Sequence, residues 1–266
     1  MPLLKRISIS AFVLIICLFL FLFNVILICA EPKKTSGVFE INDRNEDLLL
    51  LKWYKVNDLD TFLTLREKIL PVMAEAFADE ERDFLLDDKL QIRPEYAEIF
   101  EKLPQDSREL FNASIAIARY ENREERVRAT LQRYKQKWND GFVQDLVHKK
   151  PLVVIAENVN NKILGFILAC RKHPEWQIMP EIAKQKNIIW GEILGIVPDS
   201  QGRGLTRPLA LSILKIMPKT TRIIFGTLSW NTKAQKIYEW LGAKRITDNE
   251  PDSLPSDCYY EYVVKD

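Results

Sequence analysis

The chain has 266 residues with 38 basic and 37 acidic side chains, and 47% of its residues are hydrophobic. This balance is typical of a globular protein with a proper core, and it excludes the strongly basic composition of a nucleic-acid-binding domain. Four cysteines and two histidines, in the spacings found here, predict neither a disulfide framework nor a structural zinc site.

The first 30 residues differ from the rest of the chain. Two basic residues precede an almost unbroken apolar run from Ala11 to Ala30. A run of this length is long enough to cross a bilayer as a helix, so residues 11–30 predict an uncleaved, single-pass membrane anchor. The alternative is a signal peptide cleaved before Glu31, which would release a secreted protein. Basic residues flank the run on both sides, so its orientation stays open.

Residues 31–47 are polar and are predicted to form a linker, followed by one folded domain over residues 48–266. Leu48 to Val56 has the composition of a first strand. Asn57 and Asp58 then suit a helix N-cap, because the apolar residues that follow recur with helical spacing.

The next region, residues 80–148, is rich in charged residues with helical propensity. Two prolines break its first part, and residues 122–148 predict one long helix whose charges form a solvated face. Two apolar strands at 152–156 and 163–170 are joined by asparagines, which indicates a hairpin. Residues 173–186 are predicted to be a loop. The remaining elements are predicted as strands at 188–197, 222–228, 244–247 and 258–264, and helices at 207–217 and 231–241. This order indicates a mixed α/β fold.

The stretch from Ile193 to Arg207 carries the main chemical signal of the chain. An apolar strand stops at Pro198, and the polar turn Gln201-Gly-Arg-Gly-Leu-Thr206 leads into a helical pattern. Strand, turn and helix start together form an anion site, because the first amides of a helix lack intrahelical partners and the helix dipole favours negative charge there. The two glycines let the backbone approach a phosphate closely, and the arginines Arg203 and Arg207 add positive charge.

A second pattern begins 30 positions after Gln201. It runs Asn231-Thr-Lys-Ala-Gln-Lys-Ile-Tyr-Glu-Trp-Leu-Gly242 and indicates a helix that starts at its asparagine and stops at its glycine. The two patterns, in this order and at this distance, resemble those of the GNAT N-acetyltransferase superfamily. In the first of them Gln201, Gly204 and Thr206 occupy the motif positions, although the family usually has a smaller residue at the third.

The resemblance covers about residues 48–264 and is most specific over 188–243. It implies the GNAT fold, in which two central strands splay apart and the acyl-CoA enters the gap. It also implies acetyl-CoA as the acyl donor, with no metal. The residues that it assigns to acetyl-CoA are Ile196, Val197, Gln201, Gly202, Arg203, Gly204, Leu205, Thr206, Arg207 and Asn231. Asn231 has a simpler interpretation as well, that of a helix cap alone.

Two residues are candidates for catalysis. Tyr238 has the helical spacing of a core residue, and the resemblance assigns it the role of the acid that protonates the leaving thiolate. Glu192 is the carboxylate nearest to the central strand, and a partly desolvated glutamate can accept the proton of an attacking amine, directly or through water. A surface or ion-paired glutamate is the alternative.

The function that follows is transfer of an acetyl group from acetyl-CoA to a primary amine, by direct attack in a ternary complex. The alternatives are a non-catalytic acyl-CoA-binding module and an N-acyltransferase with a longer acyl donor. The acceptor site is expected in the region before Pro151, whose sequence does not identify the amine.

Overall fold

The computed structural model describes residues 34–102, 105–171, 187–217, 220, 222–228, 231–246 and 257–264. Its contacts mark off a unit from Ser36 to Asp266, which is built on a mixed eight-stranded sheet in the order β1-β2-β3-β4-β5-β6-β8-β7. Among these strands only β5 and β6 pair in parallel, and the other neighbours are antiparallel. The strands are β1 (Ser36–Asn42), β2 (Leu48–Lys55), β3 (Leu152–Asn158), β4 (Ile163–Cys170), β5 (Ile188–Ile196), β6 (Arg222–Leu228), β7 (Lys244–Ile246) and β8 (Asp257–Val263).

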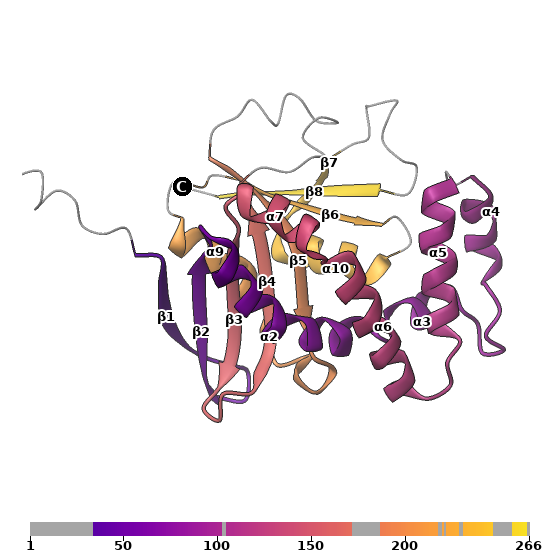
Figure 1. The fold of residues 1–266 in the computed structure, drawn as a ribbon, viewed down its shortest axis with the longest axis horizontal. Coiled ribbons are helices and arrows are strands. Elements are labelled where there is room, and N and C mark those ends of the chain that lie inside the picture. The colour runs from indigo at the N-terminus through magenta and orange to yellow at the C-terminus, as the bar shows by residue number, and fades with distance from the viewer. Residues whose placement is uncertain are drawn as a thin grey trace, which may run out of the picture. The chain divides into compact units, whose positions relative to one another are not determined.

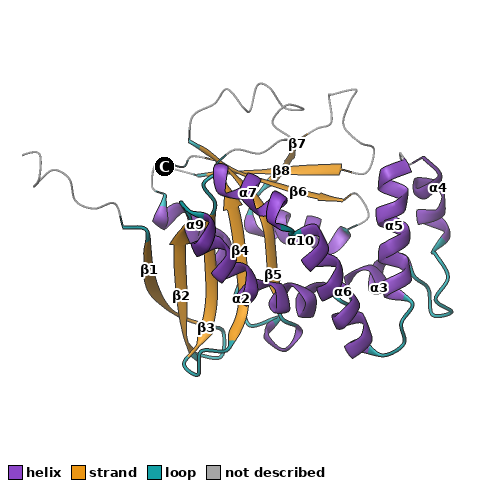
Figure 2. Cartoon of the chain, in the orientation of Figure 1, coloured by secondary structure: helices purple, strands orange, loops and turns teal. Residues whose placement is uncertain are grey.

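Helices cover both faces of this sheet (Figure 1, Figure 2). The described helices are α2 (Leu59–Phe77), α3 (Glu80–Leu85), α4 (Pro94–Lys102), α5 (Gln105–Ala118), α6 (Arg123–Lys137), α7 (Asp140–His148), the short 3-10 helix η2 (Pro198–Ser200), α9 (Thr206–Ile216) and α10 (Thr232–Leu241). Helices α2, α6 and α7 lie on one face, and α9 and α10 lie on the other. The mixed α/β class predicted from the sequence is therefore confirmed.

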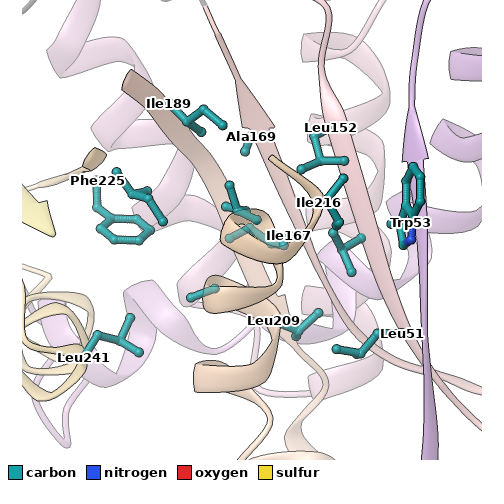
Figure 3. Packing of buried hydrophobic residues seen from close by; sticks show 14 of the residues in the cluster. Leu51, Trp53, Leu152, Ile167, Ala169, Ile189, Leu209, Ile216, Phe225 and Leu241 are labelled. Atoms are coloured by element: carbon teal, nitrogen blue, oxygen red, sulfur yellow. The ribbon is translucent and has the colours of Figure 1, made fainter. Parts of the chain in front are cut away.

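Strand β3 lies between two apolar layers, and its side chains alternate between them. Val154 packs in the layer under α9, while Val153 and Ile155 pack in the layer under α2. Figure 3 shows the first layer, in which Leu209 and Ile216 of α9 face the strands. Leu209 is fully buried, and each large apolar side chain buried in this way contributes roughly 1.5–3 kcal/mol. This packing anchors α9, and with it the turn that precedes α9.

The predicted helix over 122–148 is in fact two helices, α6 and α7. The backbone leaves helical geometry at Trp138, whose side chain is buried, and Asn139 then caps α7 by accepting a hydrogen bond from the Phe142 amide at 3.0 Å. Asn139, which lies inside the predicted helix, is thus the N-cap of a second helix. Most charged residues of α6 are exposed, as predicted, but Arg126 is buried in an ion pair with Asp79.

The predicted linker, residues 31–47, contains strand β1. This strand pairs along its whole length with β2 and alternates exposed and half-buried residues. Its inward side chains Phe39 and Ile41 pack on the layer under α9, and Phe39 stacks on Trp53. Because only every second residue of an edge strand touches the core, the composition of this stretch alone resembles that of a linker.

None of the helices among the described residues is both long and apolar enough to cross a membrane. The longest of them, α2, has 19 residues but carries several charges, including Arg66, Glu67 and Lys68, whereas a span needs about 20 mainly apolar residues. This finding contradicts the predicted membrane anchor and the membrane location, and we retain neither. Residues 11–30, on which both depended, and the predicted loop 173–186 lie outside the described residues.

Candidate active site

The candidate site lies where β5 separates from β6. The two strands pair in parallel only from Ile188 to Gly191 of β5, although β5 continues to Ile196 and β6 to Leu228. At the same point the register of β5 against β4 shifts, so that Glu192 is an extra residue opposite the Leu168–Ala169 step. Such a bulge bends a strand and re-aims a side chain. The separation of the strands therefore coincides with the position of Glu192.

Beyond the bulge, one edge of β5 is paired with β4, and the other edge faces the opening between β5 and β6. Val197 donates its N–H to the Leu164 carbonyl at 3.0 Å, so it faces β4. Since backbone groups of successive residues point to alternate sides of a strand, those of Leu194 and Ile196 face the opening. Of the two residues predicted to meet the pantetheine arm by backbone contacts, Ile196 fits that geometry. The N–H of Val197 is already used within the sheet.

The glycine turn has the backbone conformation that its sequence requires. Gly202 and Gly204 have φ angles of +79° and +84°, a region that residues with a side chain rarely adopt. Helix α9 begins at Thr206 with Leu205 at its N-cap and no side-chain cap hydrogen bond. The first amides of α9 have no intrahelical acceptor, so the turn offers donors at the positive end of the helix dipole.

The two arginines of the turn, Arg203 and Arg207, lie outside the opening between β5 and β6. The Arg203 guanidinium donates to the carboxylates of Asp43, at 2.5 Å, and Asp47, at 2.7 Å, which belong to the turn between β1 and β2. Its charge is therefore balanced by two acids. Arg207 lines a second cavity of about 680 Å³ beside α9, together with Arg203. Neither arginine lines the opening between β5 and β6.

A different arginine lies at the opening between β5 and β6. Arg44 comes from the β1–β2 turn, lines the opening, and donates from Nη1 to the Gly202 carbonyl at 3.3 Å. Its backbone N–H donates to the Arg203 carbonyl at 3.0 Å. The sequence carries no signal for this role, because Arg44 and Gly202 lie 158 positions apart.

Helix α10 forms the other wall. Asn231 caps it by accepting from the Ala234 amide at 3.0 Å, and Lys233 donates to the Gln201 side chain at 3.1 Å. Gln201 in turn donates to the Ile196 carbonyl at 3.1 Å, which links turn, strand and helix. Lys233 was not predicted, although a lysine in the first turn opposes the helix dipole and so indicates a nearby anion.

Tyr238 lies further along α10, with its ring stacked on Phe225 at a centroid distance of 4.8 Å. Its hydroxyl donates to the Gly226 carbonyl at 3.3 Å, on the part of β6 that has left β5. The ring packs like that of a core residue, and Tyr238 is also among the residues that line the cavity. The packing agrees with the core interpretation made from the sequence, and the catalytic role of Tyr238 stays a prediction.

One cavity of about 600 Å³ brings the predicted residues together. Those that line it are Glu192, Ile196, Gln201, Gly202, Gly204, Leu205, Thr206, Asn231 and Tyr238. Val197, Arg203 and Arg207 are outside this lining, for the reasons given above. The cavity joins the glycine turn to Glu192 and Tyr238.

The cavity also has a wall from the region before Pro151. Phe77, at the end of α2, and Tyr134 of α6 line it, with ring centroids 6.1 Å apart. Asp79 lines it as well, and its two oxygens pair with Arg123 at 3.0 Å and with Arg126 at 2.6 Å. This wall therefore combines two aromatic rings with Asp79, whose charge is balanced, and with the exposed Asp83 of α3.

Cys170 is a buried cysteine close to Glu192 among the described residues. Burial raises the pKa of the Cys170 thiol, and the nearby Glu192 carboxylate raises it further, so the thiol stays protonated. A buried thiol of this kind is a poor nucleophile. Within the described residues no group of three or more His, Cys, Asp or Glu side chains could hold a metal ion.

A model of the acetyltransferase (GNAT) family matches residues 109–243, just over half of the chain. The chain therefore belongs to the GNAT acetyltransferase family, whose members are transferases that move acyl groups from acyl-CoA to amines. The match includes the glycine turn, the bulge at Glu192 and helix α10, so the resemblance stated from the sequence is confirmed.

Several solved structures are similar to this chain. The GNAT domain of PAT from S. lividans is 11% identical, with 85% of this chain and 97% of that chain covered and a TM-score of 0.45. The paia N-acetyltransferase from Thermoplasma acidophilum, solved in complex with coenzyme A, is 14% identical over 80% of this chain and 99% of that one, with a TM-score of 0.43. PH1933 from Pyrococcus horikoshii is 16% identical over 81% of this chain and 99% of that chain, with a TM-score of 0.42. No curated protein matches the chain.

Proposed function

We propose that this protein transfers an acetyl group from acetyl-CoA to a primary amine by direct attack in a ternary complex. The observation that carries the proposal is one cavity lined by the glycine turn before α9, by Glu192 at the bulge and by Tyr238. The turn suits the diphosphate of coenzyme A, and the backbone of Leu194 and Ile196 suits the extended pantetheine arm. Lys233, at the start of α10, adds positive charge near the turn.

Glu192 is the proposed base. It takes a proton from the ammonium or the attacking amine, directly or through a water, and the nitrogen then bonds to the thioester carbonyl carbon. The bulge supports this role because it turns Glu192 out of the regular pairing of the strand at the mouth of the opening.

Tyr238 is the proposed acid. As the tetrahedral intermediate collapses, the carbon–sulfur bond breaks and the Tyr238 hydroxyl donates a proton to the departing thiolate. The products are an amide and the free thiol of coenzyme A. Solvent then supplies a proton to the phenolate of Tyr238 and accepts the proton that Glu192 had taken from the amine. The protonated, buried state of Cys170 favours direct transfer over an acyl-cysteine intermediate.

The acceptor amine is proposed to enter along the aromatic wall formed by Phe77 and Tyr134. This wall shares the cavity with Glu192 and comes from the part of the chain in which the acceptor site is expected. Because Arg123 and Arg126 balance Asp79, the aromatic faces and Asp83 supply the contact surface for the amine-bearing group.

The test is a thiol-release assay on the purified full chain with acetyl-CoA and a panel of primary amines, with the product identified by mass spectrometry. We expect amine-dependent thiol release and an acetylated amine. The Gly204→Val variant serves as the inactive control. Coenzyme A binding without transfer to any amine would contradict the proposal in favour of a binding module, and turnover only with longer acyl-CoA donors would replace the acetyl donor.

A further inference from the structure

The turn between β1 and β2 packs against the glycine turn through several contacts. Arg44 donates its N–H to the Arg203 carbonyl at 3.0 Å and its guanidinium to the Gly202 carbonyl at 3.3 Å. In the reverse direction Arg203 donates to Asp43 and Asp47. The two turns therefore hold each other through main-chain and side-chain bonds in both directions.

The two arginines of this contact differ in whether a carboxylate of the protein neutralises their charge. Arg203 lies between two carboxylates, and Asp43, whose side chain is fully covered, also accepts the Asn45 and Asp47 amides at 2.8 and 3.0 Å. Arg44 instead meets a neutral carbonyl, and within the described part of the chain no carboxylate forms an ion pair with it. Arg44 is exposed, so its charge is free to meet an anion from solvent.

The position of Arg44 is at the junction of two cavities. The cavity between β5 and β6 and the cavity beside α9 share three lining residues, Arg44, Gly204 and Trp240. A β-carbon built on Gly204 would lie 3.0 Å from Arg44 Cγ, so the arginine stem lies directly over the turn. The second cavity also contains the cations Arg207 and Lys215. Arg44 therefore lines both the cavity at the turn and the second cavity.

We infer that the β1–β2 turn is part of the coenzyme A site: Arg44 binds a phosphate of the coenzyme, and the ion pairs of Arg203 with Asp43 and Asp47 position Arg44. A guanidinium donates in a fork geometry that suits phosphate oxygens. Arg203 is thus a positioning residue, which contributes to binding through Arg44. The inference deepens the proposed function, because it assumes that the glycine turn holds coenzyme A.

The test measures binding of coenzyme A, 3′-dephospho-coenzyme A and pantetheine to the full chain by calorimetry. We expect Arg44→Ala to weaken coenzyme A binding by about 10-fold, because a charged hydrogen bond is lost. Binding of pantetheine, which has no phosphate, should not change. A loss that disappears with 3′-dephospho-coenzyme A assigns Arg44 to the 3′-phosphate, and a loss that persists assigns it to the diphosphate. Arg44→Lys should recover part of the affinity.

The exposed Arg128 of α6 offers a matched control, because Arg128→Ala removes one positive charge from a residue that lines neither cavity. The inference would be overturned if Arg44→Ala and Arg128→Ala bound coenzyme A with affinities within twofold of each other. It would also be overturned if Arg44→Ala weakened pantetheine binding as much as coenzyme A binding.

The role of Arg203 is tested by a double-mutant cycle. If Arg203 acts through Arg44, Arg203→Ala should weaken coenzyme A binding in the wild type and have little further effect in the Arg44→Ala background. Additive losses would show that it does not position Arg44. These readouts are separate from turnover: a chain that binds coenzyme A through Arg44 and transfers no acyl group would end the proposed function and leave this inference intact.

Discussion

Arg203 and Asp43 lie 160 positions apart in the chain and are joined by a hydrogen bond of 2.5 Å from Nε to Oδ2. The bond connects the turn between β1 and β2 with the turn that precedes α9. Each turn alone is a short polar segment on the surface. Together they form one part of the site, in which the β1–β2 turn packs against the backbone of the glycine turn.

This part of the site should depend on pH. Burial acts to raise the pKa of Asp43, but the hydrogen bonds from Arg203 and from the Asn45 and Asp47 amides outweigh it and hold that pKa below its ordinary value. A carboxyl with a lowered folded pKa stabilises the fold fully above its unfolded pKa, near about 3.9, and the effect is lost as pH falls through the folded pKa. We therefore expect Asp43→Asn to lower the melting temperature at neutral pH and to have a much smaller effect at about pH 2.5. Thermal unfolding at both pH values, with the exposed Asp88→Asn as control, checks this; an equal effect at the two values would contradict it.

Tyr238→Phe keeps the ring on Phe225 and removes only the hydroxyl that reaches Gly226. General acid catalysis typically contributes about 100- to 10,000-fold, so we expect kcat to fall by about 10-fold or more with little change in acetyl-CoA affinity. Steady-state kinetics and calorimetry on the same preparation measure both quantities. A variant that turns over within about twofold of the wild type would leave Tyr238 a packing residue.

Glu192→Gln keeps the size of the side chain at the bulge and removes its capacity to accept a proton. We expect kcat to fall by about 100-fold, the lower end of the usual range for a general base, while acetyl-CoA affinity is unchanged. The pH dependence of kcat/KM gives a second readout: the limb that reports the base should be lost in the variant. Persistence of that limb would assign the base to another group.

Gly204→Val should abolish acetyl-CoA binding while the domain still folds. Valine is strained at a φ of +84°, and its β-carbon would lie 3.0 Å from Arg44 Cγ. Calorimetry measures the binding, and circular dichroism checks the fold. Gly141→Ala in α7, where the backbone has no positive φ, is the matched control and should bind normally. Unchanged affinity in a folded Gly204→Val variant would refute the assignment of the turn to acetyl-CoA.

Asn231 is predicted to have two roles that can be separated. Asn231→Ala removes the cap on α10 and should cost about 1 kcal/mol of stability, whereas Asn231→Asp keeps an oxygen acceptor for the Ala234 amide. We expect Asn231→Asp to unfold like the wild type and to bind acetyl-CoA more weakly, because a carboxylate near the anion site repels phosphate. Normal affinity in Asn231→Asp would reduce Asn231 to a helix cap.

Local features of this protein could be predicted from its sequence because their causes are local. The Asp58 and Asn231 caps, the stop of α10 at Gly242 and the turn at Gly202 and Gly204 each depend on residues within a few positions. Backbone preference and hydrogen bonding between near neighbours decide such features. These local signals predicted the order of strands and helices, and that order predicted the mixed α/β class.

The tertiary structure alone decided which charges meet the cavity. Arg203, inside the motif, is held by Asp43 and Asp47, whereas Arg44, from the predicted linker, lines the site. Strand β1 itself became recognisable only once β2 and the core beneath it were in place. The direction of a long side chain depends on partners that folding brings from distant parts of the chain. A motif can therefore predict an anion site here, while the packing of two remote turns determines which arginine lines the cavity.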